Sequence, residues 1–245
     1  MDNAVYVGLS RQMVLRRELD LIANNVANAN TVGFKVESLL ARTEPGAPAS
    51  NDGAPRPVKF VLDGGVARDF TQGGLFSTGS DLDVGIEGDG FFEVATDEGP
   101  RYTRDGRFTL DELGRITTQA GDPVAGEGGG EIIINPENGA VTIGPDGTIS
   151  QGANLLGRIA VMRFDDLSVL QKMGDNLLSN TSNQQPQAAP DVRVRQGMLE
   201  NSNVNPILEI TRLIEVTRAY ESITRMMESS SDLSRRAVER MGRAN

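Results

Sequence analysis

Two amphipathic segments at opposite ends of the chain constrain its fold more than any other feature. In residues 3–30, apolar or small side chains recur at alternating steps of three and four, the spacing of a coiled-coil seam. The same spacing returns in residues 206–243. Helices of this kind can bury their seams only against each other or against neighbouring subunits. The two ends therefore predict a chain that assembles.

Each predicted helix has a clear sequence signal at the end that leads into the middle of the chain. Residues 30–33 (NTVG) end the first helix, because Asn and Gly both adopt the left-handed conformation that closes helices. Asn205 and Pro206 begin the second helix. The Asn side chain can cap free backbone N–H groups, and Pro suits the first helical position because no backbone N–H is needed there. A further apolar line near this start predicts contacts on more than one side; it runs through Ile207, Ile210, Ile214 and Thr217.

Four of the seven residues from 24 to 30 are Asn, which is an unusual density for a poor helix former. One interpretation is that these amides cap the end of the helix. The other is that they form hydrogen bonds across helix contacts in the assembled state and so fix a register that an apolar seam would leave free. The sequence supports the two interpretations equally.

The middle of the chain predicts β structure. Residues 41–65 are rich in Pro and Gly and are expected to resist both helix and continuous sheet. Short alternating runs separated by turn signals follow, with a hairpin expected at Asp105-Gly106. The predicted class is α+β: long N- and C-terminal helices pair as a coiled-coil-like layer and flank a central antiparallel all-β domain. The predicted segments are a helical segment at 1–34, an extended connector at 35–69, a β domain at 70–195 and a second helical segment at 196–245.

Composition argues against catalysis and against several kinds of partner. The chain has no Cys, His or Trp, which removes thiol nucleophiles, imidazole bases and most zinc, haem and iron–sulfur ligand sets. Its formal net charge of −10 disfavours binding to nucleic acid. No apolar run is long enough to span a membrane, and residues 1–7 do not resemble a secretory signal peptide. We expect a protein that is no enzyme and holds no metal or cofactor.

Two groups of acidic residues are candidate sites. The carboxylates between residues 81 and 89 could suit calcium, but their spacing fails the EF-hand pattern and favours solvated turns. Asp165-Asp166 could serve glycoside hydrolysis, which would make the middle a carbohydrate-binding or carbohydrate-active domain. With only 4% aromatic residues, surface charge is the better interpretation.

Three motifs carry a family resemblance. Residues 21–35 (LIANNVANANTVGFK) resemble the N-terminal signature of the bacterial flagellar axial proteins, the rod and hook family. Residues 196–204 (QGMLENSNV) and 218–221 (RAYE) are similar to the C-terminal element of that family. Residues 74–84, 88–92 and 101–106 are similar to its central part. The short β insert is more similar to a rod subunit than to the hook subunit. The first ten residues resemble the proximal-rod member, with the distal-rod or a hook-type member as the alternative.

The resemblance implies a structural subunit of the basal-body rod in the periplasm. It implies polymerisation through the terminal helices into a hollow drive shaft, with the β domain outside. Implied partners are other rod subunits, further copies of the chain and the flagellar type III export apparatus, which would export it without a cleavable signal peptide. The residues expected at the assembly interface are Leu15, Leu19, Ile22, Asn24, Asn25, Val26, Asn28, Leu213, Val216, Tyr220, Ile223 and Met227.

Overall fold

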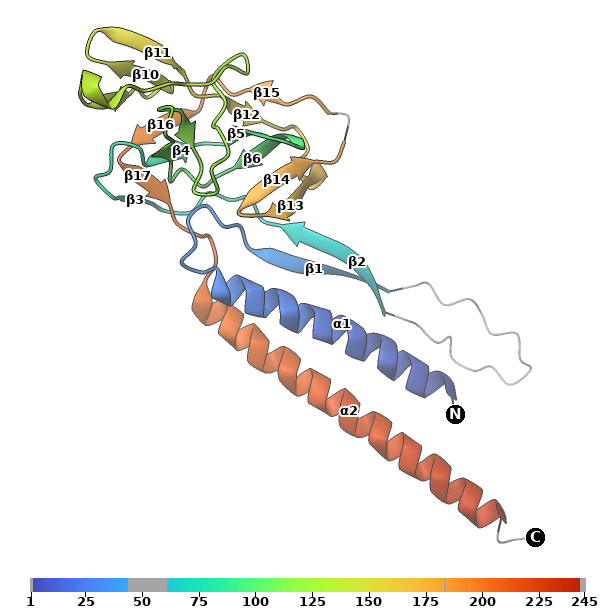
Figure 1. Ribbon diagram of the computed structural model, residues 1–245. Helices are drawn as coiled ribbons and strands as arrows, with labels where there is room; N and C mark the ends of the chain where they lie inside the picture. The colour runs from blue at the N-terminus through green and yellow to red at the C-terminus, as the bar shows by residue number, and fades with distance from the viewer. Residues whose placement is uncertain (1, 44–60, 183, 243–245) are drawn as a thin grey trace. The chain divides into compact units, whose positions relative to one another are not determined.

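The computed structural model describes residues 2–43, 61–182 and 184–242, which form two compact units (Figure 1). Both units are built from segments that are distant in the sequence. Unit 1 contains Met1–Ala27, Glu37–Arg68 and Asn205–Asn245. Unit 2 contains Asn28–Val36 and Asp69–Val204. The N-terminal segment is thus divided between the units, and the predicted connector lies almost entirely in unit 1.

Unit 1 is a helix pair with a β hairpin against the first helix. Helix α1 spans Asp2–Ala27 and helix α2 spans Pro206–Gly242. The second helix begins where the sequence predicts, since the Asn205 side chain accepts hydrogen bonds from the backbone N–H groups of Ile207 and Leu208. The first helix ends three residues earlier than residue 30, and residues 28–30 form a turn.

The hairpin of unit 1 corrects a prediction. Strand β1 (Glu37–Thr43) pairs antiparallel with β2 (Val61–Arg68), so residues 41–65 do not resist sheet at either flank. The four prolines that suggested this lie between residues 44 and 60, outside the described residues. A two-stranded hairpin is marginal by itself. Here both strands pack against α1, which supplies the missing support.

Unit 2 is an antiparallel β assembly with two short 3₁₀ turns, η1 (Pro136–Asn138) and η2 (Leu167–Val169). Its largest sheet has the order β13-β14-β6-β5-β12-β15, a second has the order β11-β10-β9, and β16-β4, β17-β3 and β7-β8 are pairs. The strands are β3 Leu75–Ser77, β4 Val84–Glu87, β5 Phe91–Thr96, β6 Gly99–Thr103, β7 Thr109–Leu110, β8 Ile116–Thr117, β9 Val141–Ile143, β10 Thr148–Gln151, β11 Asn154–Arg158, β12 Val161–Arg163, β13 Leu170–Gly174, β14 Leu177–Asn180, β15 Gln187–Ala188, β16 Arg193–Gln196 and β17 Met198–Glu200. The α+β class with a central antiparallel domain is confirmed.

The core of unit 2 consists of two apolar clusters. The larger one surrounds Phe92, which is fully buried and meets the Phe108 ring edge-on at 5.0 Å. The smaller one joins Phe91, Tyr102 and Phe164, again through edge-on ring contacts. Aromatic residues are few in this chain, and those in β5 and β6 are buried in these two clusters.

The hairpin predicted at Asp105-Gly106 is wrong. Strand β6 pairs with β5 and β14, whereas β7 pairs with β8, so the two runs flanking this dipeptide do not face each other. Gly106 has a different role. Its carbonyl accepts the N–H of Val84, and a Cβ at Gly106 would overlap the Val84 carbonyl and press on the Phe92 ring. The glycine permits a close approach of two backbones.

Replacing Gly106 by Ala tests this close approach. We expect the substitution to lower the free energy of unfolding of unit 2 by about 2 kcal/mol, because the backbone at Val84 must move. Gly130→Ala is the matched control, since a Cβ there meets no atom within 4 Å. Urea unfolding of both variants measures the difference. Equal midpoints would contradict the assignment.

Candidate assembly interface

The helices of unit 1 pack side by side and run antiparallel (Figure 1). Three pairs define their register. A Cβ at Gly8 would lie 3.0 Å from Met227 Cγ, Gln12 Nε2 donates to Thr224 Oγ1 at 3.2 Å, and Asn25 Nδ2 donates to Glu209 Oε2 at 2.9 Å. The small residue at position 8 therefore lets the helices approach closely near the start of α1.

The predicted seam residues come together within one chain. Leu15, Ile22 and Val216 are buried in a single cluster. Partly buried residues pack around them, and these are Leu19, Val26, Leu213, Ala219, Tyr220 and Ile223. Met227 is half-buried beside Gly8. The seam of each helix thus has its partner inside the subunit, and its role between subunits stays a prediction.

The three predicted asparagines have different environments. Asn25 is 1% exposed and uses its whole amide: Oδ1 accepts the N–H of Glu37 at 3.0 Å, while Nδ2 donates to the carbonyl of Glu37 at 2.8 Å and to Glu209. Asn24 is exposed. Asn28 belongs to unit 2, where its carbonyl and its side-chain oxygen accept hydrogen bonds from Thr31. One amide therefore bonds across the helix contact, and another closes a turn after α1.

Two buried carboxylates around Asn25 were missed from the sequence. Glu209 is 2% exposed and accepts a hydrogen bond from Arg212 as well as from Asn25. Glu37 is buried at the start of β1 and pairs with Arg68 at 2.7 Å. The position of Glu209 could have been found, because it lies one step of four before Leu213 on the seam. The position of Glu37 depends on the hairpin, which the sequence did not reveal.

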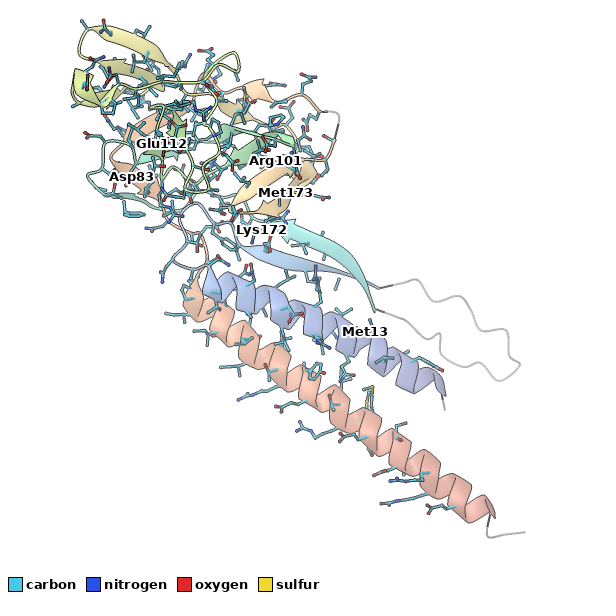
Figure 2. The ribbon with its side chains drawn as sticks, in the orientation of Figure 1. Met13, Asp83, Arg101, Glu112, Lys172 and Met173 are labelled. Atoms are coloured by element: carbon cyan, nitrogen blue, oxygen red, sulfur yellow. The ribbon has the colours of Figure 1, made fainter. Side chains whose placement is uncertain are left out.

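The helix pair also exposes apolar side chains away from its seam. On α1 these are Tyr6, Leu9 and Met13, at steps of three and four, and Met13 (labelled in Figure 2) is 66% exposed. On α2, Ile207 is 79% exposed, and Ile210 and Ile214 continue the same line. Over its described residues, neither helix is apolar enough for long enough to cross a membrane.

In unit 2, a buried carboxylate joins the two segments that lead to the helices. Glu200, 1% exposed, accepts hydrogen bonds from Lys35 Nζ at 2.6 Å, from Arg104 Nη1 at 3.1 Å and from the Gly73 N–H at 2.8 Å. Burial lowers the pKa of Lys35 from its ordinary value, and the nearby Glu200 charge partly opposes that effect. The guanidinium of Arg104 also lies 5.2 Å from the centre of the Phe91 ring.

Backbone hydrogen bonds reinforce this junction. The N–H of Gly33 donates to the carbonyl of Glu200 at 2.8 Å, and the side chain of Asn203 accepts the N–H of Val36 at 2.8 Å. Gly33 has φ +68° and lies against the backbone of Arg104, where a Cβ would not fit. The chain therefore enters and leaves unit 2 along two adjacent segments.

Both members of the Asp165-Asp166 pair have structural partners, and Asp165 accepts a hydrogen bond from the Gln187 side chain at 3.1 Å. Asp166 caps η2, and hydrogen bonds from Ser168 lower the pKa of its carboxyl, the opposite of what a general acid needs. A cleft of about 210 Å³ has Glu127 and Asp146 on its wall. Hydrogen bonds from Thr148 lower the pKa of Asp146. Within the described residues, no group of three acidic side chains is placed to hold a metal ion.

Glu200→Gln tests the buried junction. The substitution keeps the size of the side chain but leaves two buried cations without a counter-charge, so we expect a loss of about 3 kcal/mol in the free energy of unfolding. Glu87→Gln is the control, because its ion pair with Arg195 is exposed and should contribute less than about 1 kcal/mol. Urea unfolding at neutral pH compares the two, and equal losses would contradict the assignment.

Three regions of the chain match family models. Residues 5–35 match the flagella basal body rod protein model, residues 85–151 match the flagellar hook protein FlgE/F/G D1 domain, and residues 195–240 match the flagellar basal body rod FlgEFG protein C-terminal model. Lys35, Arg104 and Glu200 each belong to a different match. The buried junction of unit 2 therefore unites all three regions.

Curated relatives agree with these matches. The chain is 59% identical over 245 residues to the flagellar basal-body rod protein FlgF of Caulobacter vibrioides, with 100% of both chains covered. It is 37% identical to FlgF of Mesorhizobium japonicum, with 99% of each chain covered. It is 31% identical to the flagellar basal-body rod protein FlgG of Bacillus subtilis, with 97% of this chain and 98% of the relative covered. The chain belongs to the family of flagellar basal-body rod proteins, and it is a FlgF-like member of that family.

Proposed function

We propose that this rod subunit polymerises through its terminal helices, which form a coiled-coil-like inner layer around a hollow shaft. The exposed apolar lines on the helix pair are the observation that carries the proposal. The seam is already occupied within the chain, yet Ile207, Ile210 and Ile214 and the line through Met13 remain accessible. Exposed apolar residues that align along an element are typical of protein contacts.

A contact between two different faces of identical subunits repeats without closing and so builds a filament. The helix pair offers two such faces, one on α1 and one on α2. In this proposal the residues of the seam hold each subunit's helices together, and the exposed lines bind the next subunit. The subunit would occupy the proximal rod and reach it through the flagellar type III export apparatus, in agreement with its likeness to FlgF proteins.

The rival from another class is a carbohydrate-binding or carbohydrate-active β domain. It gains no specific support from unit 2. The cleft wall contains carboxylates, but one of them is engaged by Thr148 and the other, Glu127, lies 3.5 Å from Arg158. We therefore propose no enzymatic role.

Polar substitution of the exposed α2 line tests the proposal. In the triple variant Ile207→Gln, Ile210→Gln and Ile214→Gln, we expect helix content and melting temperature to stay near those of the parent, because the side chains are already exposed. Rod assembly and motility should fail when the variant replaces the parent gene. Electron microscopy of basal bodies and a swimming assay measure this outcome.

The matched control places the same residue type at three exposed polar positions of α2: Glu215→Gln, Ser222→Gln and Ser229→Gln. This control should swim. Normal rods in the isoleucine variant, or loss of motility in the control alone, would overturn the assignment of the interface.

Charge insertion tests the seam. Leu19→Asp and Ile223→Asp each place a carboxylate in the apolar cluster between the helices, which should cost about 2 kcal/mol or more and separate them. We expect lower helix content and no rod. Ala23→Asp, at an exposed position of α1, is the control. Intact rod assembly and motility in both seam variants would refute a role for the seam.

A further inference from the structure

We infer that the hydrogen bond between Asn25 and Glu209 fixes the register of the two helices, which the apolar seam leaves open. Both residues belong to one subunit, and both are deeply buried on a seam that is otherwise formed mainly by apolar side chains.

The seam by itself is degenerate. Interpolation between the pairs Gln12–Thr224 and Asn25–Glu209 places Leu19 opposite Val216. If α2 slid by one seam step, Leu19 would meet Leu213 in one direction and Tyr220 in the other. Both are apolar and belong to the same cluster. Hydrophobic burial alone therefore distinguishes poorly between the three registers.

The polar pair is not degenerate. A slip in one direction would place Asn25 opposite Leu213 and carry Glu209 past Ala27, the end of α1. A slip in the other direction would place Glu209 opposite Ile22, where a buried carboxylate would have an apolar neighbour. Either slip leaves buried polar groups without their partners, which is the costly outcome for a hydrogen-bonding group. Single polar residues fix register in this way in coiled coils.

The hairpin further restricts the position of the Asn25 side chain. The Asn25 amide also holds both the N–H and the carbonyl of Glu37 in β1, and the Glu37 carboxylate is tied to Arg68 in β2. Asn25 therefore cannot rotate to seek another partner on α2 without breaking the attachment of β1. Glu209 is likewise oriented by its second bond, to Arg212. One amide links three elements of unit 1.

Disulfide trapping in the full-length protein tests the inference. The chain contains no cysteine, so only the engineered cysteine pairs can form disulfides. Gly8→Cys with Met227→Cys reports the observed register, because a Cβ at position 8 lies 3.0 Å from Met227 Cγ, close enough for a disulfide. Gly8→Cys with Ile223→Cys and Gly8→Cys with Ser230→Cys report the two slips. Mass spectrometry of the linked peptides measures intramolecular yield after mild oxidation of dilute protein.

In the Asn25→Leu, Glu209→Leu background, the yield of slipped disulfides relative to the observed one should rise about tenfold, the factor that corresponds to losing one buried hydrogen bond. Gln12→Leu with Thr224→Leu is the control. It removes the cross-helix hydrogen bond between Gln12 and Thr224, which is only half-buried, and should change the ratio less than about twofold. An unchanged ratio in the first background, or equal rises in both, would overturn the inference.

A second variant keeps the test valid if the leucine pair unfolds. Asn25→Asp preserves volume but sets two carboxylates against each other, so slipped disulfides should increase. Adding Glu209→Gln removes one of the two facing carboxylates and supplies a donor at position 209, so the slipped yield should fall to a value between those of Asn25→Asp and the parent. The rescue is partial because a carboxylate at position 25 cannot replace the N–H that Asn25 donates to the Glu37 carbonyl. Failure of Asn25→Asp to raise the slipped yield, or failure of Glu209→Gln to rescue it, would equally overturn the inference.

Discussion

The fold depends on a junction in unit 2 where the two segments that lead to the terminal helices meet. Glu200 forms ion pairs with both Lys35 and Arg104 in a site that is closed to solvent, and its backbone carbonyl accepts the N–H of Gly33. A buried carboxylate with two cations and a backbone donor is stable only when every partner is present. The junction therefore requires that residues 28–36 and 200–204 come together.

The helix pair solves a different physical problem. Its seam buries apolar surface without specifying position, whereas Asn25 and Glu209 specify position at the cost of burying polar groups. The two interactions are complementary, since one supplies most of the stabilisation and the other selects one arrangement. The apolar lines that remain exposed are then free to serve the contacts between subunits that we propose.

Several features were predictable because they depend on local chemistry. The start of α2 follows from Asn205 and Pro206, and the seam members follow from their spacing. Turn signals were less reliable. Asp146-Gly147 does join the paired strands β9 and β10, but Asp105-Gly106 joins strands that pair elsewhere. A turn dipeptide shows that the chain bends there, and it does not show which strands pair.

The sequence by itself determined the two helical ends, the antiparallel β class of the middle and the family that the chain resembles. These features follow from periodicity and motifs, which are local properties of the chain. Tertiary structure decided which polar residues matter. Lys35, Arg104 and Glu200 are far apart in sequence, and only folding removes water from all three at once. For Asn25 the sequence leaves capping and cross-helix hydrogen bonding equally open, and its contacts with β1 and α2 decide for the second. Burial gives these charges and amides their energetic weight, and burial is a property of the whole fold.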